Sequence, residues 1–343
     1  MFKVCPWAVF IIGFPGNLLC IITVCCMHSM TPAIFLVVAL SVCDALSLLT
    51  KIIGNELVKN KVVIGSIGCK LFFIPPYIST IANWILIFIC AERFVAVCFP
   101  LKKALIVTTT RCGISLALVS VAFLIIFAAF YGTIRTSFPN GWECGGFTEY
   151  RYAWRTVYFW LNAFIFLIIP FTCILIFTTL IILGLARSRQ HRRELMRGSG
   201  SGRTSTPSNN RRLMREAERV EKTITVMLIF AALVFLILSL PGAVYIFTWR
   251  ATDDPLVYAR QRVFKQIQFL CFDLTHALNF FIYFFSARRF RLNLFRLLRC
   301  YPGVCGRRVA NPPTRALSVR ASYHSVVTRS TGAGHREHGE SNM

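Results

Sequence analysis

Seven long apolar runs fill most of the chain and constrain its fold more than any other feature of the sequence. Each is about as long as a helix that crosses roughly 30 Å of bilayer hydrocarbon. Such runs satisfy their backbone hydrogen bonds internally as α-helices, whereas the strands of a membrane barrel alternate apolar and polar residues. They lie near residues 4–27, 33–53, 68–98, 111–133, 154–185, 220–249 and 263–285. The sequence therefore predicts an all-α membrane protein, a seven-transmembrane helix bundle.

Composition supports this fold class. Apolar residues make up 56% of the chain, 31 residues are Phe and the mean hydropathy is +0.61, which would leave a water-soluble domain with too much apolar surface. The first run is longer than the apolar core of a signal peptide, and no small-residue cleavage site follows it. We therefore expect it to be retained as the first span.

The distribution of Lys and Arg predicts the orientation, because cytoplasmic loops carry an excess of basic residues. With the N-terminus outside, the inner side receives ten Arg between Arg187 and Arg219 and eleven more from Arg288 to Arg336. We therefore expect the C-terminus in the cytoplasm. The net charge of +24 then reflects topology and attraction to the anionic inner leaflet rather than nucleic-acid binding, for which the sequence contains no motif.

The segments outside the spans are predicted to be small. We expect a short extracellular N-terminus at residues 1–3, a membrane domain at 4–299 and a disordered cytoplasmic tail at 300–343. A basic inner loop at 187–219, rich in Ser and Gly, is also predicted to be disordered. Arg alternates with Phe and Leu from 287 to 299, which predicts a short amphipathic helix on the inner leaflet after the last span.

Ionisable residues inside the spans are costly and are expected to be functional. Asp44 lies in the middle of the second span, where it either pairs with a partner in the bundle or packs in its protonated form. Arg93 lies at the inner end of the third span, where it either pairs or extends to the interface. The seventh span carries one polar stripe, made of Gln266, Asp273, His276, Asn279 and Tyr283. That stripe predicts either a cavity wall or a polar contact with another helix, and His276 fits a hydrogen-bonded core histidine as well as a ligand contact or proton relay.

The residues that follow, taken in chain order, identify a family. They are Gly16-Asn17, Asp44, Glu92-Arg93-Phe94, Pro170, Pro241 and the run from Asn279 to Tyr283. In order and span position they resemble the landmarks of rhodopsin-like (class A) G-protein-coupled receptors, over about residues 4–300. Glu-Arg-Phe stands for the family's Asp-Arg-Tyr, and the last run stands for its Asn-Pro-x-x-Tyr. Asn279-Phe280 and the sequence that continues to Arg291 are similar to invertebrate neuropeptide receptors of the FMRFamide and thyrotropin-releasing-hormone-like kind.

The resemblance implies a plasma-membrane receptor that binds an extracellular ligand, a neuropeptide, and activates a heterotrimeric G protein. Arrestin, receptor kinases and membrane lipids are its further implied partners. The implied activation switch comprises Glu92, Arg93, Phe94, Glu221, Phe235, Pro241, Asn279 and Tyr283, with Arg93 and Glu221 latching the inner ends of spans three and six. The implied polar network within the membrane comprises Asn17, Asp44 and Asn279. The implied ligand contacts are Asp273, Gln266 and His276.

Four cysteines and two departures from the family pattern also bear on the predicted structure and function. The resemblance implies a disulfide between Cys69 and Cys144 that pins the second outer loop. Cys300 and Cys305 close the amphipathic helix and are either palmitoylation sites or plain thiols. Ala82 stands where a Ser completes the family's sodium pocket, and Leu238-Ser239-Leu240-Pro241 replaces Cys-Trp-x-Pro, so we expect Phe235 to take part of the missing Trp's role.

Two alternatives remain open at this point. Asp273 is either an anionic anchor for a basic group of the ligand or a residue that only bonds a neighbouring helix. A transporter or channel with an ion path of Asp44, Asp273 and His276 would explain the polar stripe, but not the Glu92-Arg93-Phe94 motif or the paired cysteines. The sequence contains no phosphate loop, zinc-binding spacing or nucleophile elbow, so no enzyme activity, metal or cofactor is expected.

Overall fold

The computed structural model describes residues 5–25, 31–136, 144–146, 153–198, 208–248, 254–286 and 288–299. Its elements in chain order are α1 (Cys5–Cys25), α2 (Pro32–Lys59), α3 (Gly65–Leu71), α4 (Ile74–Cys98), α5 (Lys103–Ile106), α6 (Thr109–Tyr131), β1 (Ile134–Thr136), β2 (Cys144–Gly146), η2 (Ala153–Tyr158), α7 (Phe159–Ala163), η3 (Phe164–Ile168), α8 (Ile169–Gly198), α9 (Ser208–Thr248), α10 (Pro255–Ser286) and α11 (Arg288–Arg299). The chain forms two compact units, Met1–Leu292 and Asn293–Met343, and the helix bundle belongs to the first.

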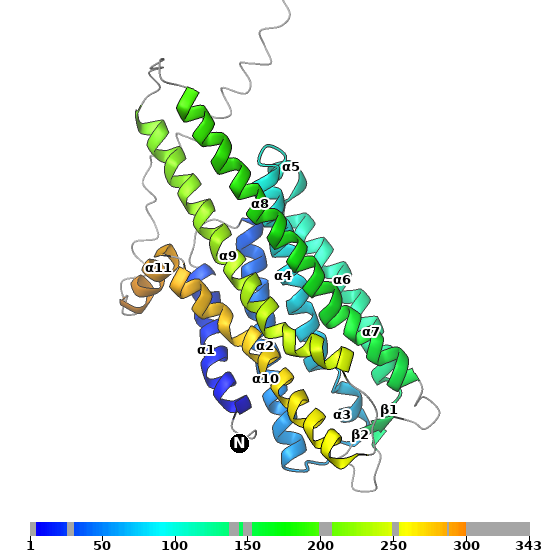
Figure 1. Cartoon of the computed structure of the whole chain (residues 1–343). Coiled ribbons are helices and arrows are strands. Elements are labelled where there is room, and N and C mark those ends of the chain that lie inside the picture. The colour runs from blue at the N-terminus through cyan, green and yellow to red at the C-terminus, as the bar shows by residue number, and fades with distance from the viewer. Residues whose placement is uncertain are drawn as a thin grey trace, which may run out of the picture. The chain divides into compact units, whose positions relative to one another are not determined.

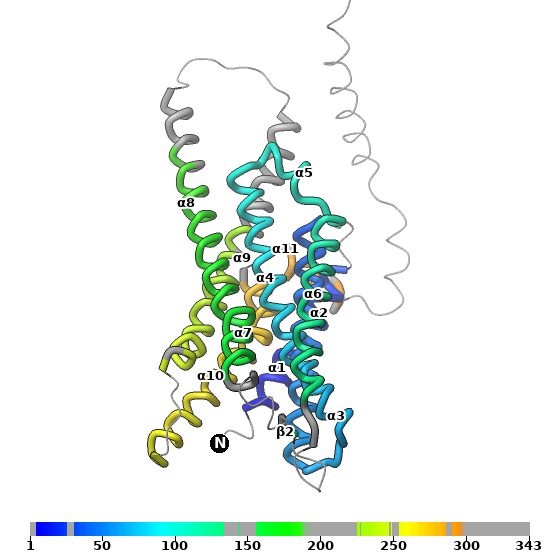
Figure 2. The backbone as a smooth tube through the Cα atoms, turned by 90° about the vertical axis from the view of Figure 1, so that its right-hand side faces the viewer, coloured from blue at the N-terminus to red at the C-terminus, as the bar shows by residue number. Residues whose placement is uncertain are grey.

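Seven membrane-length apolar helices are found among the described residues. They are α1, α2, α3 together with α4, α6, the stretch from η2 into α8, α9 and α10. Figures 1 and 2 show them side by side as a bundle, with α4 between α6 and α8. Helix α1 packs against α2 and α10, and α4 contacts α2, α6, α8 and α9. The predicted seven-helix fold class, with a short helix after the last span, is confirmed.

Several helices extend beyond the apolar runs that predicted them. Helix α2 continues to Lys59, and α10 begins at Pro255 rather than near residue 263. Helices α8 and α9 also occupy 187–198 and 208–219, so these parts of the predicted disordered loop are helical instead. Arg, Glu, Leu, Met and Gln are good helix formers, which allows a helix to continue once its apolar run has ended.

Proline positions shape the third and fifth spans. Pro75 and Pro76 lie in the first turn of α4, and the preceding helix α3 ends at Leu71, so the third span is divided here. Pro170 follows the π-helical segment η3 and has no N–H to donate. The carbonyls of Ile165 and Phe166, five and four residues earlier, instead accept hydrogen bonds from side chains of α4. Trp84 Nε1 donates to Ile165 O at 3.0 Å, and Asn83 Nδ2 donates to Phe166 O at 3.1 Å.

Glycine allows α1 to approach α10 closely. A Cβ on Gly13 would lie 2.6 Å from both the Cβ of Ala277 and Cδ1 of Leu48. A Cβ on Gly16 would lie 3.0 Å from the Cβ of Phe280. Small residues at such positions are a common means of helix packing in membranes, and here they position α1 against the polar part of α10.

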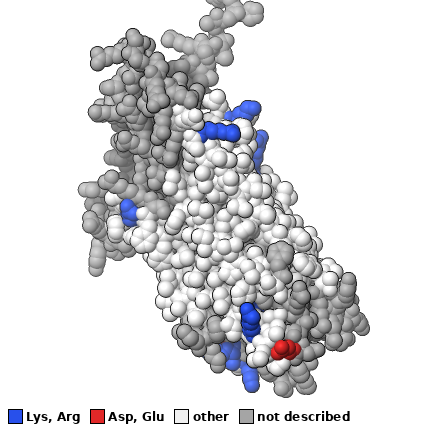
Figure 3. Space-filling model, in the orientation of Figure 1, with Lys and Arg blue, Asp and Glu red and all other residues white. Residues whose placement is uncertain are grey.

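A two-stranded antiparallel pairing of β1 with β2 adds a small feature that the sequence did not predict. The strands lie at the end of the bundle where α1 begins, and we call this the hairpin end; α5 lies at the opposite end, the α5 end (Figure 1). On the face drawn in Figure 3, the described charged side chains lie toward the two ends and leave an uncharged middle. That distribution is typical of a bundle with a lipid-facing belt.

Candidate functional site

A cavity of about 520 Å³ opens at the hairpin end of the bundle. Described residues of α1, α2, α4, α6, α7, η3 and α10 line it. Its polar side chains include Lys51, Asn55, Ser79, Asn162, Gln266, Gln268 and Asp273. A volume of this size lies within the range of sites that hold small organic ligands or part of a peptide.

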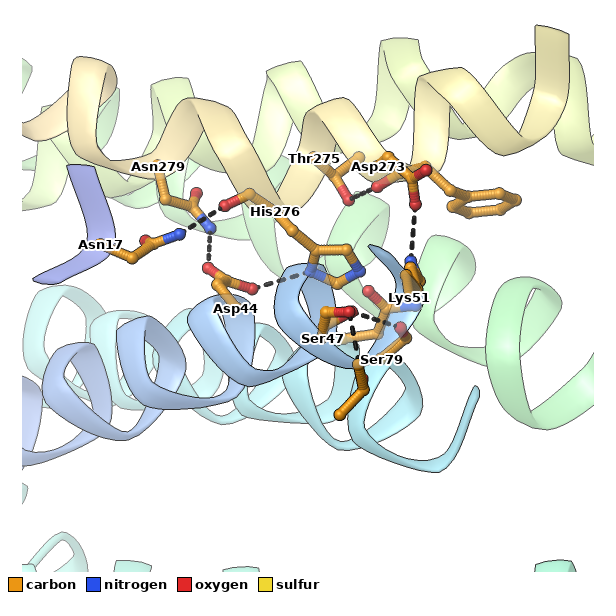
Figure 4. A network of polar contacts seen from close by, with 12 residues as sticks. Asn17, Asp44, Ser47, Lys51, Ser79, Asp273, Thr275, His276 and Asn279 are labelled. Carbon is orange, nitrogen blue, oxygen red and sulfur yellow. Dashed lines mark hydrogen bonds and ion pairs between the residues drawn. The ribbon is translucent and has the colours of Figure 1, made fainter. Parts of the chain in front are cut away.

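An ion pair between α2 and α10 forms the charged part of the cavity wall. Lys51 Nζ lies 2.7 Å from Asp273 Oδ1, and 23% and 18% of the two side chains are exposed (Figure 4). Asp273 was expected either to anchor a ligand or to bond a neighbouring helix, and the structure shows the bond to the neighbouring helix α2. Sequence reasoning missed Lys51, although it lies seven residues after Asp44 and hence on the same face of α2.

The other two predicted ligand contacts, Gln266 and His276, lie at different depths in the bundle. Gln266 lines the cavity together with Asp273. Gln268, which the sequence did not single out, also lines it, and its Oε1 is buried without a hydrogen-bond partner among the described residues. His276 is directed to Asp44 instead and lines a second, much smaller space of about 10 Å³.

Four polar residues form a buried network beneath the cavity (Figure 4). His276 Nδ1 lies 2.8 Å from Asp44 Oδ1, and Asn279 Nδ2 donates to Asp44 Oδ2 at 2.6 Å. Asn17 Nδ2 donates to the main-chain carbonyl of His276 at 2.9 Å. The network thereby joins α1, α2 and α10. Asp44 is completely buried, and its two carboxylate oxygens each have a protein partner.

The Glu92-Arg93-Phe94 motif lies near the α5 end of α4. The Arg93 guanidinium forms a buried two-point ion pair with the adjacent Glu92, in which Nη2 donates to Oε1 at 2.6 Å. Lys103 Nζ lies 3.8 Å from the same Oε1 atom. The Phe94 ring contacts Phe177 of α8 at 5.8 Å between centroids. The Glu221 side chain, the expected partner of Arg93, lies outside the side chains that the structure describes.

Three further residues of the expected switch lie within the bundle. Phe235 is buried at 3% exposure and lines the small space beside Asp44. Pro241 lies inside α9. Tyr283 is also buried, and its ring lies 6.4 Å from that of Phe290.

The cysteines follow the pattern implied by the resemblance where the structure describes them. A disulfide joins Cys69 of α3 to Cys144 of β2 across 75 residues of sequence, and ties the strand pair to the third span. Cys300 and Cys305 lie outside the described residues. Among the residues described, no group of three or more His, Cys, Asp or Glu is placed to hold a metal ion.

Comparison with known proteins yields one family and two relatives that share part of their length with this chain. A family model described as 7 transmembrane receptor (rhodopsin family) matches residues 16–283. Olfactory receptor 7C1 of Homo sapiens is 32% identical over 113 residues, which cover 31% of this chain and 35% of that receptor. Sex peptide receptor-related protein 2 of Caenorhabditis elegans is 23% identical over 293 residues, which cover 76% of this chain and 59% of that protein. The matched regions thus span about one third to three fifths of these relatives.

Proposed function

Since the chain belongs to the rhodopsin family of seven-transmembrane receptors, we propose that it binds an extracellular ligand and activates a heterotrimeric G protein. In this proposal the hairpin end faces the outside of the plasma membrane, and the α5 end, with Lys102, Lys103 and Arg111, faces the cytoplasm. The cavity at the hairpin end supports it most directly, because it is large enough for a ligand and lies between spans.

The ion pair in the cavity wall favours a ligand that carries both donors and acceptors. A simple amine that bound Asp273 would displace Lys51 and leave its ammonium group without the carboxylate. The amine would only exchange one ion pair of Asp273 for another in a part-exposed site, so it gains little there. A peptide offers amide N–H and C=O groups together, and can approach Asp273 with one and Lys51 with the other. The amide side chains of Asn162 and Gln266 offer further hydrogen bonds along the same wall.

One of the two relatives supports a peptide over an amine. The Caenorhabditis elegans protein is described as related to a sex peptide receptor, and its match covers 76% of this chain, whereas the olfactory receptor matches 31% and carries no such description. We therefore propose a peptide ligand, which the sequence resemblance to neuropeptide receptors also implies.

At the α5 end we propose that Arg93 changes partners on activation. In the resting receptor Arg93 is held between Glu92 and Glu221, and outward movement of α9 releases it to open a site for the G protein. The buried Glu92–Arg93 pair supports this proposal because it holds the guanidinium where a helix of a partner would approach. Glu221→Ala should then raise basal signalling at equal surface level, and unchanged basal signalling would count against the latch.

The tail adds partners to the proposal. Ser and Thr in 300–343 would take phosphate from receptor kinases and so recruit arrestin, and palmitoylation of Cys300 and Cys305 would hold α11 to membrane lipids.

The proposed function is tested by screening a peptide library against cells that express the full chain, with a second-messenger readout. We expect at least one peptide to give a response that is absent from untransfected cells and from cells with an Arg93→Ala variant at equal surface level. Ion currents or solute uptake that depend on Asp44 and Asp273, without a second-messenger response, would instead favour the transporter or channel.

A further inference from the structure

The carboxylate of Asp44 is the deepest charged group that the structure describes in the second span, and it is completely buried. A carboxylate at this depth needs a counter-charge or hydrogen-bond donors. The family resemblance implies a sodium ion in this region, held by oxygen atoms around the carboxylate. Whether this chain can hold such an ion depends on what already surrounds Asp44.

Protein donors occupy both oxygens of Asp44. The His276 imidazole lies on one, with Nδ1 at 2.8 Å from Oδ1, and the Asn279 amide lies on the other at 2.6 Å (Figure 4). A cation that approached Oδ1 from the side of the ring would have to displace the imidazole. The ring is enclosed, because His276 is only 2% exposed, and the main chain beside it is held by the hydrogen bond that its carbonyl accepts from Asn17.

With the ring in place, the surroundings also leave a cation few oxygens and too little space for the ion and its water ligands. Apart from Asp44, the side-chain oxygens on this wall are those of Asn83, Thr275 and Asn279. Hard cations are held by several oxygen atoms at once. Ala82, on the wall of the adjoining space, has no side-chain oxygen. The nearby Ser47 and Ser79 hydroxyls are hydrogen-bonded to each other at 2.7 Å, and Thr275 Oγ1 donates to the Phe272 carbonyl. The space itself measures about 10 Å³, which is roughly room for one water molecule.

We propose that the His276 side chain takes the place of an inorganic cation on Asp44, so that this receptor binds no sodium in the membrane core. The imidazole fills the position as a hydrogen-bond donor from α10, and the link between α2 and α10 is therefore built into the chain rather than dependent on the ion. In this receptor the Asp44 site does not respond to extracellular sodium.

The experiment measures thermal unfolding of the purified full chain, without ligand, in sodium chloride and in choline chloride at equal ionic strength. We expect the same melting temperature in both salts. His276→Ala removes the ring, and should yield a receptor that sodium stabilises by on the order of a few degrees relative to choline, because ligand binding to the folded state raises stability. The matched control is Asp44→Asn in the His276→Ala background, which should lose that sodium response.

Two results would overturn the proposal. One is a higher melting temperature of the unaltered chain in sodium than in choline that Asp44→Asn abolishes. The other is a His276→Ala receptor that melts cooperatively yet shows no sodium response, because the imidazole would then not be what excludes the ion. If His276→Ala does not fold, the comparison of salts on the unaltered chain still decides the matter.

Discussion

Two pairs, each made of a carboxylate and a nitrogen-bearing side chain, join α2 to α10, and they differ in depth and in exposure to solvent. Lys51–Asp273 lies on the wall of a cavity of about 520 Å³ with 23% and 18% of its side chains exposed. His276–Asp44 lies deeper beside a space of about 10 Å³, with 2% and 1% exposed. A partly exposed pair can exchange its partners for those of a ligand, whereas a closed pair can only hold its helices together. Depth within the bundle thus separates a proposed recognition site from a structural one.

The largest effect is expected from removing the deep carboxylate. Asp44→Ala leaves the Asn279 amide and the His276 ring without their acceptor in a dry interior, which should cost about 3–5 kcal/mol in stability. Asp273→Ala is the matched control, since Lys51 can still reach solvent in the cavity. The measurement is the melting temperature of the purified chain together with its surface level in cells. Equal losses for the two variants would remove the distinction between the pairs.

A second large effect is expected at the hairpin end, where the cavity opens and the disulfide lies. Cys144→Ser opens the disulfide to Cys69 and should cost about 2–4 kcal/mol, because the unfolded chain is no longer cross-linked. Cys69→Ser should cost the same, and the double variant should be no worse than either single one. Additive losses in thermal unfolding would show that the two residues act separately.

An intermediate effect is expected beside the deep pair. Asn83→Ala leaves the Phe166 carbonyl, freed by Pro170, without its donor and should cost about 1–3 kcal/mol. Asn162→Ala removes the same kind of side chain from the wall of the outer cavity, where water can replace it, and should cost less. Thermal unfolding of the two variants compares a buried with an open polar site, and a greater loss for Asn162→Ala would contradict the comparison.

The smallest effect on stability is expected from breaking the shallow pair. Lys51→Met and Asp273→Asn should each cost about 0–1 kcal/mol, because the pair is part-exposed. With a peptide found in the library screen, however, both should weaken the dose–response at equal surface level. If only Asp273→Asn weakened the dose–response, the ligand would bind the carboxylate alone. The proposal that the ligand binds both Lys51 and Asp273 would then fail.

The seven spans and the family could be predicted from the sequence, because the length and hydropathy of an apolar run are local properties of the chain. The same holds for the need of Asp44 for polar partners, since a carboxylate at mid-span requires them wherever the other helices lie. The helical ends of α8 and α9 were missed because their charged residues resemble a loop in composition while favouring a helix in conformation.

Partner choice was decided only by the tertiary structure. Lys51 and Asp273 are 222 residues apart, and Asp44 and His276 are 232 residues apart, so no local pattern states which will meet. The same is true of Asn83, whose donation to Phe166 depends on how α4 lies beside the break at Pro170. The sequence determined which groups must be paired, because burying an unpaired polar group costs free energy in any arrangement of the helices. The rotation and depth of each helix in the bundle then selected the partner, and with it whether a pair faces a ligand-sized cavity or a closed core.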